Sequence, residues 1–145
     1  MSGLSLCRLL LSASDESAFV PVWQEAQADA ARLAPKGARI FEGACASCHT
    51  GTNALSSLAL NSNLHSDSPD NLLQAILNGV EAPAILAQTT GRETPEIMSM
   101  PGFRDTLDEQ QIADLAAYLR ARFAPGKASW DGIGEALRRV GSVVH

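Results

Sequence analysis

Two cysteines and a histidine occupy the segment Cys45-Ala46-Ser47-Cys48-His49, in which the thiols are three residues apart and the imidazole follows directly. Thiols at this spacing can each form a thioether with one vinyl group of the same porphyrin. The adjacent histidine then lies beneath the ring, where its imidazole can bind the iron. The segment therefore predicts one covalently attached haem c, with Cys45 and Cys48 as attachment sites and His49 as an iron ligand.

Two other kinds of site also use paired cysteines. A thioredoxin-like dithiol requires alternating strands and helices, and this chain has almost no strand pattern. A structural zinc ion requires about four ligands. The remaining candidates for those ligands, which show no paired spacing, are Cys7, His65 and His145. We therefore interpret the motif as a haem site and Cys7 as a free thiol.

The second axial ligand decides whether a haem iron carries electrons or performs chemistry at an open position. The candidates are Met98, Met100, His65 and His145. We favour Met100 because Pro101 holds the preceding residue in an extended conformation, which presents the thioether from a stiff turn. Met98 remains an alternative, since residues two apart on an extended segment point the same way. We expect His65 to be solvated or to cap a helix, and His145 to be exposed.

The composition limits the size of the protein and its partners. The chain has 145 residues, is 46% hydrophobic, and carries a net charge of −5. These values predict one domain of ordinary globular composition, in which a haem would form part of the core. The acidic balance and the lack of a basic stripe argue against a nucleic-acid partner. No apolar run approaches the ~18 residues of a membrane span.

The first 20 residues have no sustained period, and we expect them to be disordered or a remnant of processing. Leu4 to Leu11 is a short apolar stretch that Arg8 interrupts, and no convincing cleavage site follows it, so it is a poor export signal.

Helical spacing surrounds the haem motif on both sides. Trp23, Ala26, Ala30 and Leu33 predict a connecting helix that begins near Val22 and ends before Pro35. A second helix, from about Lys36 to Ala46, carries Phe41 as a core residue and leads into the motif.

Three further helical segments follow. Ser68 and Pro69 begin a helix that ends at Asn78-Gly79 and buries Leu72, Leu73, Ile76 and Leu77. Asp108 and Gln111 form a capping box for a helix that ends at Pro125-Gly126 and whose buried residues are Ile112, Leu115, Ala116, Leu119 and Phe123. The tail has a short amphipathic piece, which packs either on the domain or on a neighbour, with Ile133, Leu137 and Val140.

Two segments lack periodicity, and we predict that each runs along one face of the haem as a loop. They are Thr50 to His65 and Val80 to Ser99. The predicted fold class is therefore all-α, with helices wrapped around one haem.

The order of these segments resembles a class I cytochrome c domain. The matching segments are Cys45 to His49, Leu58-Ala59-Leu60-Asn61, Asp70-Asn71-Leu72-Leu73 leading to Gly79, Met100-Pro101-Gly102-Phe103, and Ile112 to Arg120. More narrowly, roughly Ala34 to Trp130 are similar to the C-terminal haem domain of multihaem cytochrome subunits. These subunits serve bacterial alcohol dehydrogenases and molybdenum hydroxylases of the nicotinate or isoquinoline type.

The resemblance implies a cytochrome c domain over residues 35–126, with an N-terminal extension over 1–34 and an irregular C-terminal tail over 127–145. It implies His49 as the proximal ligand and Met100 as the distal ligand of one haem c. It also implies a periplasmic electron carrier, not an enzyme, that relays single electrons from a dehydrogenase to a cytochrome or oxidase. Two alternatives stay open: a haem enzyme or gas sensor with a displaceable distal ligand, and a structural subunit with an empty motif.

Overall fold

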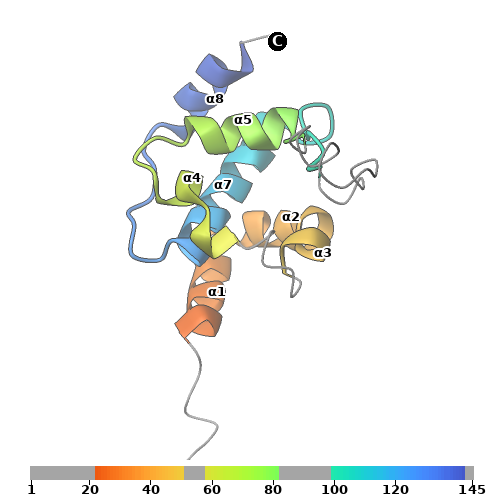
Figure 1. Cartoon of the computed structure of the whole chain (residues 1–145). Coiled ribbons are helices and arrows are strands. Elements are labelled where there is room, and N and C mark those ends of the chain that lie inside the picture. The colour runs from red at the N-terminus through yellow and green to blue at the C-terminus, as the bar shows by residue number, and fades with distance from the viewer. Residues whose placement is uncertain (1–21, 51–57, 82–98, 143–145) are drawn as a thin grey trace, which may run out of the picture.

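The structure of the protein is a computed structural model, of which residues 22–50, 58–81 and 99–142 are described. Its regular elements in these ranges are α1 (Val22–Leu33), α2 (Pro35–Ala44), α3 (Ala46–His49), η3 (Leu58–Leu60), α4 (Ser62–His65), α5 (Asp70–Asn78), α7 (Glu109–Phe123) and α8 (Ile133–Gly141) (Figure 1). The described residues contain no β-strand, only an isolated antiparallel bridge between Val80 and Met100. The all-α prediction is confirmed.

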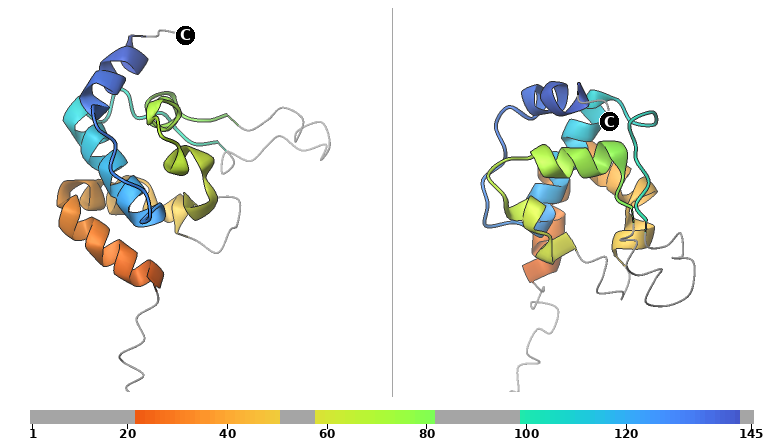
Figure 2. Two further views of the ribbon diagram at one scale, coloured as in Figure 1. Left: turned by 90° about the vertical axis from the view of Figure 1, so that its left-hand side faces the viewer. Right: turned by 45° about the horizontal axis from the view of Figure 1, so that its top comes forward.

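Helix α7 is the central element of the bundle, and α1, α2, α5 and α8 all contact it (Figure 2). Helices α2 and α7 cross so closely that one position on α2 has no room for a side chain. A Cβ atom at Gly37 would lie 2.0 Å from the carbonyl oxygen of Asp114. Glycine at this position therefore lets the helix that carries the haem motif rest directly on α7.

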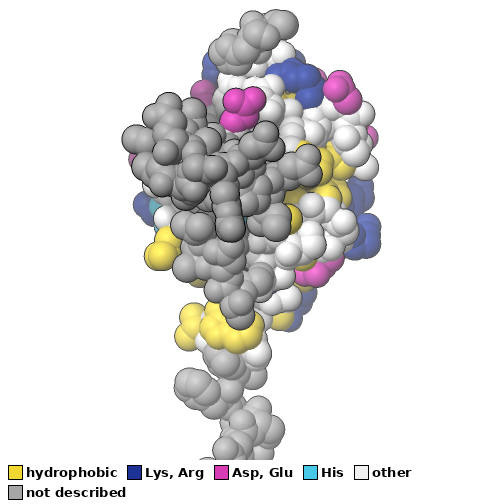
Figure 3. Space-filling model, turned by 45° about the vertical axis from the view of Figure 1, so that its right-hand side comes forward, with side chains coloured by type: hydrophobic (Ala, Val, Ile, Leu, Met, Phe, Trp, Pro, Cys, Tyr) yellow, Lys and Arg dark blue, Asp and Glu magenta, His cyan; other side chains and the backbone are white. Residues whose placement is uncertain are grey.

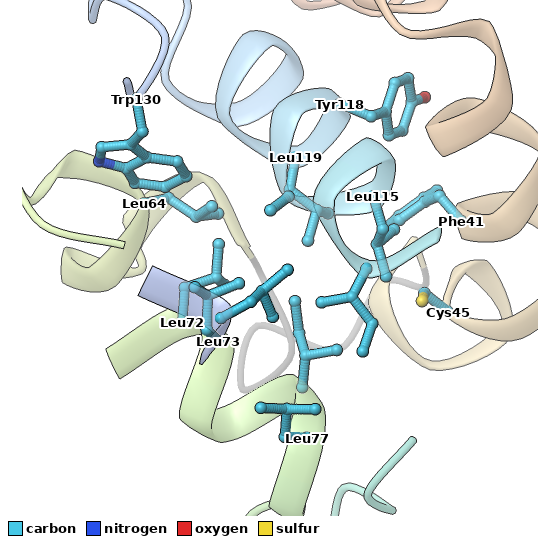
Figure 4. Packing of buried hydrophobic residues seen from close by; sticks show 14 of the residues in the cluster. Phe41, Cys45, Leu64, Leu72, Leu73, Leu77, Leu115, Tyr118, Leu119 and Trp130 are labelled. Carbon is cyan, nitrogen blue, oxygen red and sulfur yellow. The ribbon is translucent and has the colours of Figure 1, made fainter. Parts of the chain in front are cut away.

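The core is one cluster of buried side chains to which α1, α2, α4, α5, α7 and α8 contribute (Figure 4). Its largest fully buried members are Tyr118, Phe41, Leu64, Leu73, Ile76, Ile112 and Leu115. Cys45 lies at one edge of this cluster, near Phe41 and Leu115, and Trp130 lies at the other edge, near Leu64. The prediction that Phe41 is a core residue is confirmed.

Two predicted helix ends are confirmed: the capping box at the start of α7 and the glycine at the end of α5. Asp108 accepts a hydrogen bond from the Gln111 N–H at 2.7 Å, and the Gln111 side chain accepts one from the Asp108 N–H at 2.9 Å. The start of α5 differs from the prediction by one residue: Pro69, and not Ser68, is the N-cap, although the Ser68 hydroxyl accepts from the Asp70 N–H at 3.3 Å. Helix α5 ends at Gly79, whose φ of 77° is in the left-handed region that favours glycine.

The predicted loop from Thr50 to His65 is wrong over its last part, where Ser62–His65 form the short helix α4. The Asn61 side chain caps this helix by accepting a hydrogen bond from the Asn63 N–H at 2.9 Å. Leu64 anchors it in the core and is fully buried. A capping residue three positions before a lone leucine was the available signal, but the segment is too short to show a period.

Helix α1 buries a narrower face than its sequence predicts. Ala26 and Ala30 are buried against the bundle, whereas Trp23 and Leu33, from the same helical stripe, are 64% and 77% exposed. Hydrophobic side chains gather on the surface where α1 begins, at Val22 and Trp23 (Figure 3). Small residues at the contact let α1 approach α7 closely, and this leaves the large side chains outside.

The amphipathic piece of the tail forms helix α8, which packs on the domain of its own chain. It packs on α5 and α7 of the same chain and buries Ala136, Leu137 and Val140. Arg139 also forms an ion pair with Asp70 on α5, with the nitrogen and oxygen 2.6 Å apart. The tail, predicted to be irregular, is therefore helical over Ile133–Gly141.

Several predictions fall on residues outside the described ranges. These are the disorder of residues 1–20, the free thiol of Cys7, the exposure of His145, the alternative ligand Met98 and most of the second loop. Among the helices that are described, none has the length and apolar character that crossing a bilayer requires.

The close crossing of α2 and α7 generates a stability prediction. Gly37→Ala places a methyl group against the Asp114 carbonyl, so we expect the free energy of unfolding to fall by about 1–3 kcal/mol or more. Gly43→Ala on the same helix is the matched control, because a Cβ atom there meets nothing within 4 Å. Alanine is the better helix former, so the control should be neutral or gain up to about 1 kcal/mol. Urea denaturation measures both variants, and equal stabilities would contradict the close crossing.

The ion pair between α5 and α8 generates a pH prediction. The hydrogen bond and charge of Arg139 lower the pKa of the Asp70 carboxyl from its usual 3.8. A lowered pKa in the folded state stabilises the protein above the usual pKa, and this contribution disappears as the pH falls through the folded-state value. Asp70→Asn should therefore lower Tm at pH 7, and the difference from the unmodified protein should shrink as the pH falls below about 4. Arg139→Gln should show the same pH-dependent loss of Tm. If its Tm difference does not change with pH, the ion pair is not the source of the effect in Asp70→Asn.

Candidate functional site

The haem motif lies at the junction of α2 and α3. The Cys45 N–H donates a hydrogen bond to the Phe41 carbonyl at 2.9 Å and so completes the last turn of α2. The Cys45 carbonyl then accepts from the N–H groups of Cys48 at 3.2 Å and His49 at 3.0 Å. The chain passes directly from one helix into the next, and all three predicted haem residues share one helical turn.

The two thiols of the motif have different surroundings. Cys45 is buried, and burial, with a smaller contribution from Cys48, raises the pKa of its thiol to about 11. Cys48 is exposed, and the side chain of His49 is partly buried. Neither cysteine forms a disulfide. Two free thiols and an adjacent imidazole are the groups that covalent haem attachment needs, so the residues present fit this cofactor.

Met100 lies on a backbone segment that is fixed to the end of α5. Its N–H donates to the Val80 carbonyl at 2.8 Å, and its carbonyl accepts from the Val80 N–H at 2.9 Å. A Cβ atom at Gly79 would lie 2.3 Å from the Met100 carbonyl oxygen, so the close approach requires glycine. The Met100 side chain is partly buried against the core.

The segment after Met100 continues along the last turn of α5. The Phe103 N–H donates to the Ile76 carbonyl at 2.9 Å, and the Arg104 N–H donates to the Leu77 carbonyl at 3.2 Å. A Cβ atom at Gly102 would lie 2.7 Å from the Leu77 carbonyl oxygen. These contacts use helix-end carbonyls that have no partner within the helix, and they fix the position of the Met100 backbone.

The predicted ligands lie on the same side of the molecule. Figures 1 and 2 show α3, which ends at His49, on the side where the end of α5 carries the Val80–Met100 bridge. Of the alternative ligands, His65 is exposed, and its Nε2 lies 3.0 Å from the carbonyl of Ala59. Met98 and His145 lie outside the described residues.

A cavity of about 360 Å³ lies away from these residues, between α5, α7 and α8. It is lined by Leu77, Arg104, Leu107, Glu109, Ile112, Leu137, Arg138, Gly141 and Ser142. Because the lining includes none of the predicted haem residues, this cavity is separate from the candidate haem site.

Arg120 is a buried cation that the sequence interpretation missed. Its Nη1 donates to the carbonyls of Leu64 and Ser66, and its Nε donates to the Ala128 carbonyl at 2.9 Å. The guanidinium lies 4.3 Å from the centre of the Trp130 ring, and the Trp130 Nε1 donates to the Ser66 carbonyl at 2.9 Å. Arg120 therefore joins the segment after α7 to the segment between α4 and α5. Its spacing of four residues from the buried Ala116 was the available signal.

Arg122 connects the helices on the other side of α7. Its guanidinium lies 4.8 Å from the centre of the Phe41 ring and 4.9 Å from that of Phe123. It also donates to the Tyr118 hydroxyl at 3.0 Å and to the Gln27 side chain of α1 at 3.2 Å. These contacts support the turn of α2 that leads into Cys45.

Comparison with known proteins shows which family this chain is similar to. The family model of cytochrome c matches residues 34–122. A subunit of the nicotinate dehydrogenase of Pseudomonas putida is 42% identical over 131 residues, which cover 80% of this chain and 10% of that protein. The cytochrome c subunit of the quinone alcohol dehydrogenase of Gluconobacter oxydans is 33% identical over 116 residues, which cover 74% of this chain and 23% of the subunit.

This chain therefore spans only a small part of each of these relatives. No solved structure matches it. The family model covers more than half of the chain, including the α2–α3 turn with its two free thiols and the segment with Met100. This protein therefore belongs to the cytochrome c family, whose members are electron carriers with covalently bound haem c.

Proposed function

We propose that this chain is a monohaem electron-transfer domain whose iron is bound by His49 and Met100. The observation that carries the proposal is the fixed position of both residues. His49 ends a helix that continues directly from α2, and the backbone of Met100 forms two hydrogen bonds with Val80. The single Cys-X-X-Cys-His motif supports one haem, attached at Cys45 and Cys48.

The residues of the chain favour electron transfer over chemistry at an open iron position. The bound haem supplies an iron that gains and loses single electrons. Ligands held by rigid backbone need to move little when the charge of the iron changes. A thioether ligand raises the reduction potential relative to a second imidazole, because it favours the ferrous state.

The relatives support a place for this domain beside a dehydrogenase. Both are named as subunits of a dehydrogenase, and one is named as a cytochrome c subunit. We infer that a dehydrogenase donates electrons to this haem and that a cytochrome or an oxidase accepts them. We place this exchange in the periplasm, with the haem domain over residues 35–126. Redox partners of this kind usually meet through small, weak interfaces.

The absorption spectrum of the ferric protein tests the proposed ligation. A weak band at about 695 nm reports a bond between methionine sulfur and ferric haem iron. The unmodified protein should show this band, Met100→Ala should lose it, and Met98→Ala should keep it. The reverse result for the two variants would identify Met98 as the ligand.

Carbon monoxide separates electron transfer from the alternative function. The unmodified ferrous protein should bind carbon monoxide poorly because Met100 occupies the sixth position, and Met100→Ala should bind it readily. An unmodified protein that lacks the band and binds carbon monoxide as readily as the variant would favour a haem enzyme or gas sensor.

A further inference from the structure

Arg104 lies four residues after Met100, and its side chain joins two helices. Its Nη2 donates a hydrogen bond to the Asn78 side-chain oxygen at 2.8 Å, and its Nη1 donates to the Gly141 carbonyl at 3.1 Å. Its backbone N–H donates to the Leu77 carbonyl at 3.2 Å. One residue therefore connects the segment that follows Met100 to the last residues of both α5 and α8.

The position of the guanidinium has an electrostatic reason. The last carbonyls of a helix have no partner within the helix, and they carry the negative end of the helix dipole. Asn78 is the last residue of α5, and Gly141 is the last residue of α8. Arg104 contacts α8 through the Gly141 carbonyl and α5 through the Asn78 side chain, so its cation lies at the C-terminal ends of both helices.

Helix α8 lies outside residues 34–122, which match the cytochrome c family model. Its C-terminal end nevertheless reaches the segment that presents Met100, through Arg104. The contact thus joins an element beyond the family match to the backbone of a proposed iron ligand.

We propose that Arg104 is a positioning residue for Met100, and that its bonds to Asn78 and Gly141 determine how easily the methionine leaves the iron. This inference rests on the proposed function, because it takes Met100 to be the distal ligand. When an external ligand displaces the methionine, the segment around Met100 must move. Arg104 resists that movement, because its side chain holds the segment to two helices at once.

Binding of imidazole to the ferric holoprotein measures the cost of displacing the methionine. Arg104→Gln removes the charge and the two-pronged donor, so we expect it to tighten imidazole binding about tenfold. Arg104→Lys keeps the charge but loses the two donor nitrogens of the guanidinium. Its imidazole affinity should lie between those of Arg104→Gln and the unmodified protein. Asn78→Ala removes one of the two acceptors of the Arg104 guanidinium and should tighten imidazole binding about threefold. This variant also tests the proposal if Arg104→Gln fails to fold.

Arg139→Gln is the matched control. It removes another arginine that connects α8 to α5, but its partner Asp70 is the first residue of α5, at the opposite end from Asn78. Its imidazole affinity should stay within about twofold of the unmodified value. Hydrogen exchange of the Phe103 and Arg104 amides gives a readout that does not depend on the iron. Exchange at these amides should become faster in Arg104→Gln and stay unchanged in Arg139→Gln.

The outcomes separate this inference from the proposed function. If the unmodified protein shows the methionine band while Arg104→Gln binds imidazole with unchanged affinity, the positioning role is wrong and the ligation stands. Equal tightening by Arg139→Gln would also overturn the role, because general loosening of α8 would then explain the effect. If the unmodified protein lacks the band, the ligation by Met100 is wrong, and this inference fails with it.

Discussion

The position of the haem motif depends on the contact of α2 with α7. Gly37 brings the two backbones together at one point. One turn further along α2, the Phe41 ring packs against Tyr118 and Phe123, with ring centres 5.5 Å and 5.7 Å apart. The Phe41 carbonyl then accepts the Cys45 N–H. A continuous series of contacts that begins in the core therefore fixes the position of Cys45, the first of the two predicted attachment sites.

The opposite side of the site depends on the end of α5. There, Gly79 turns the chain, the Met100 segment returns antiparallel to Val80, and helix-end carbonyls accept its N–H groups. The helices that fix the two proposed iron ligands meet in one core through α7. An electron carrier benefits from this arrangement, because ligands held by a common rigid core move little between oxidation states.

The features predicted from the sequence are those set by neighbouring residues. The haem motif, the capping box of Asp108 and Gln111, and the glycine that ends α5 each act over a few positions. The features that the sequence did not predict depend on contacts between distant segments. Helix α4 is stabilised by burial of Leu64, and the buried charge of Arg120 is satisfied by carbonyls that are remote in sequence. The exposed side of α1 could not be predicted either, because its periodicity does not reveal which residues meet α7.

Intact-mass measurement of the denatured, exported protein tests the covalent attachment most directly. We predict a mass equal to the polypeptide plus one haem, because thioether bonds from Cys45 and Cys48 survive unfolding. If the protein is exported by cells that attach haem c and its mass is that of the polypeptide alone, the claim that Cys45 and Cys48 bind haem covalently is contradicted.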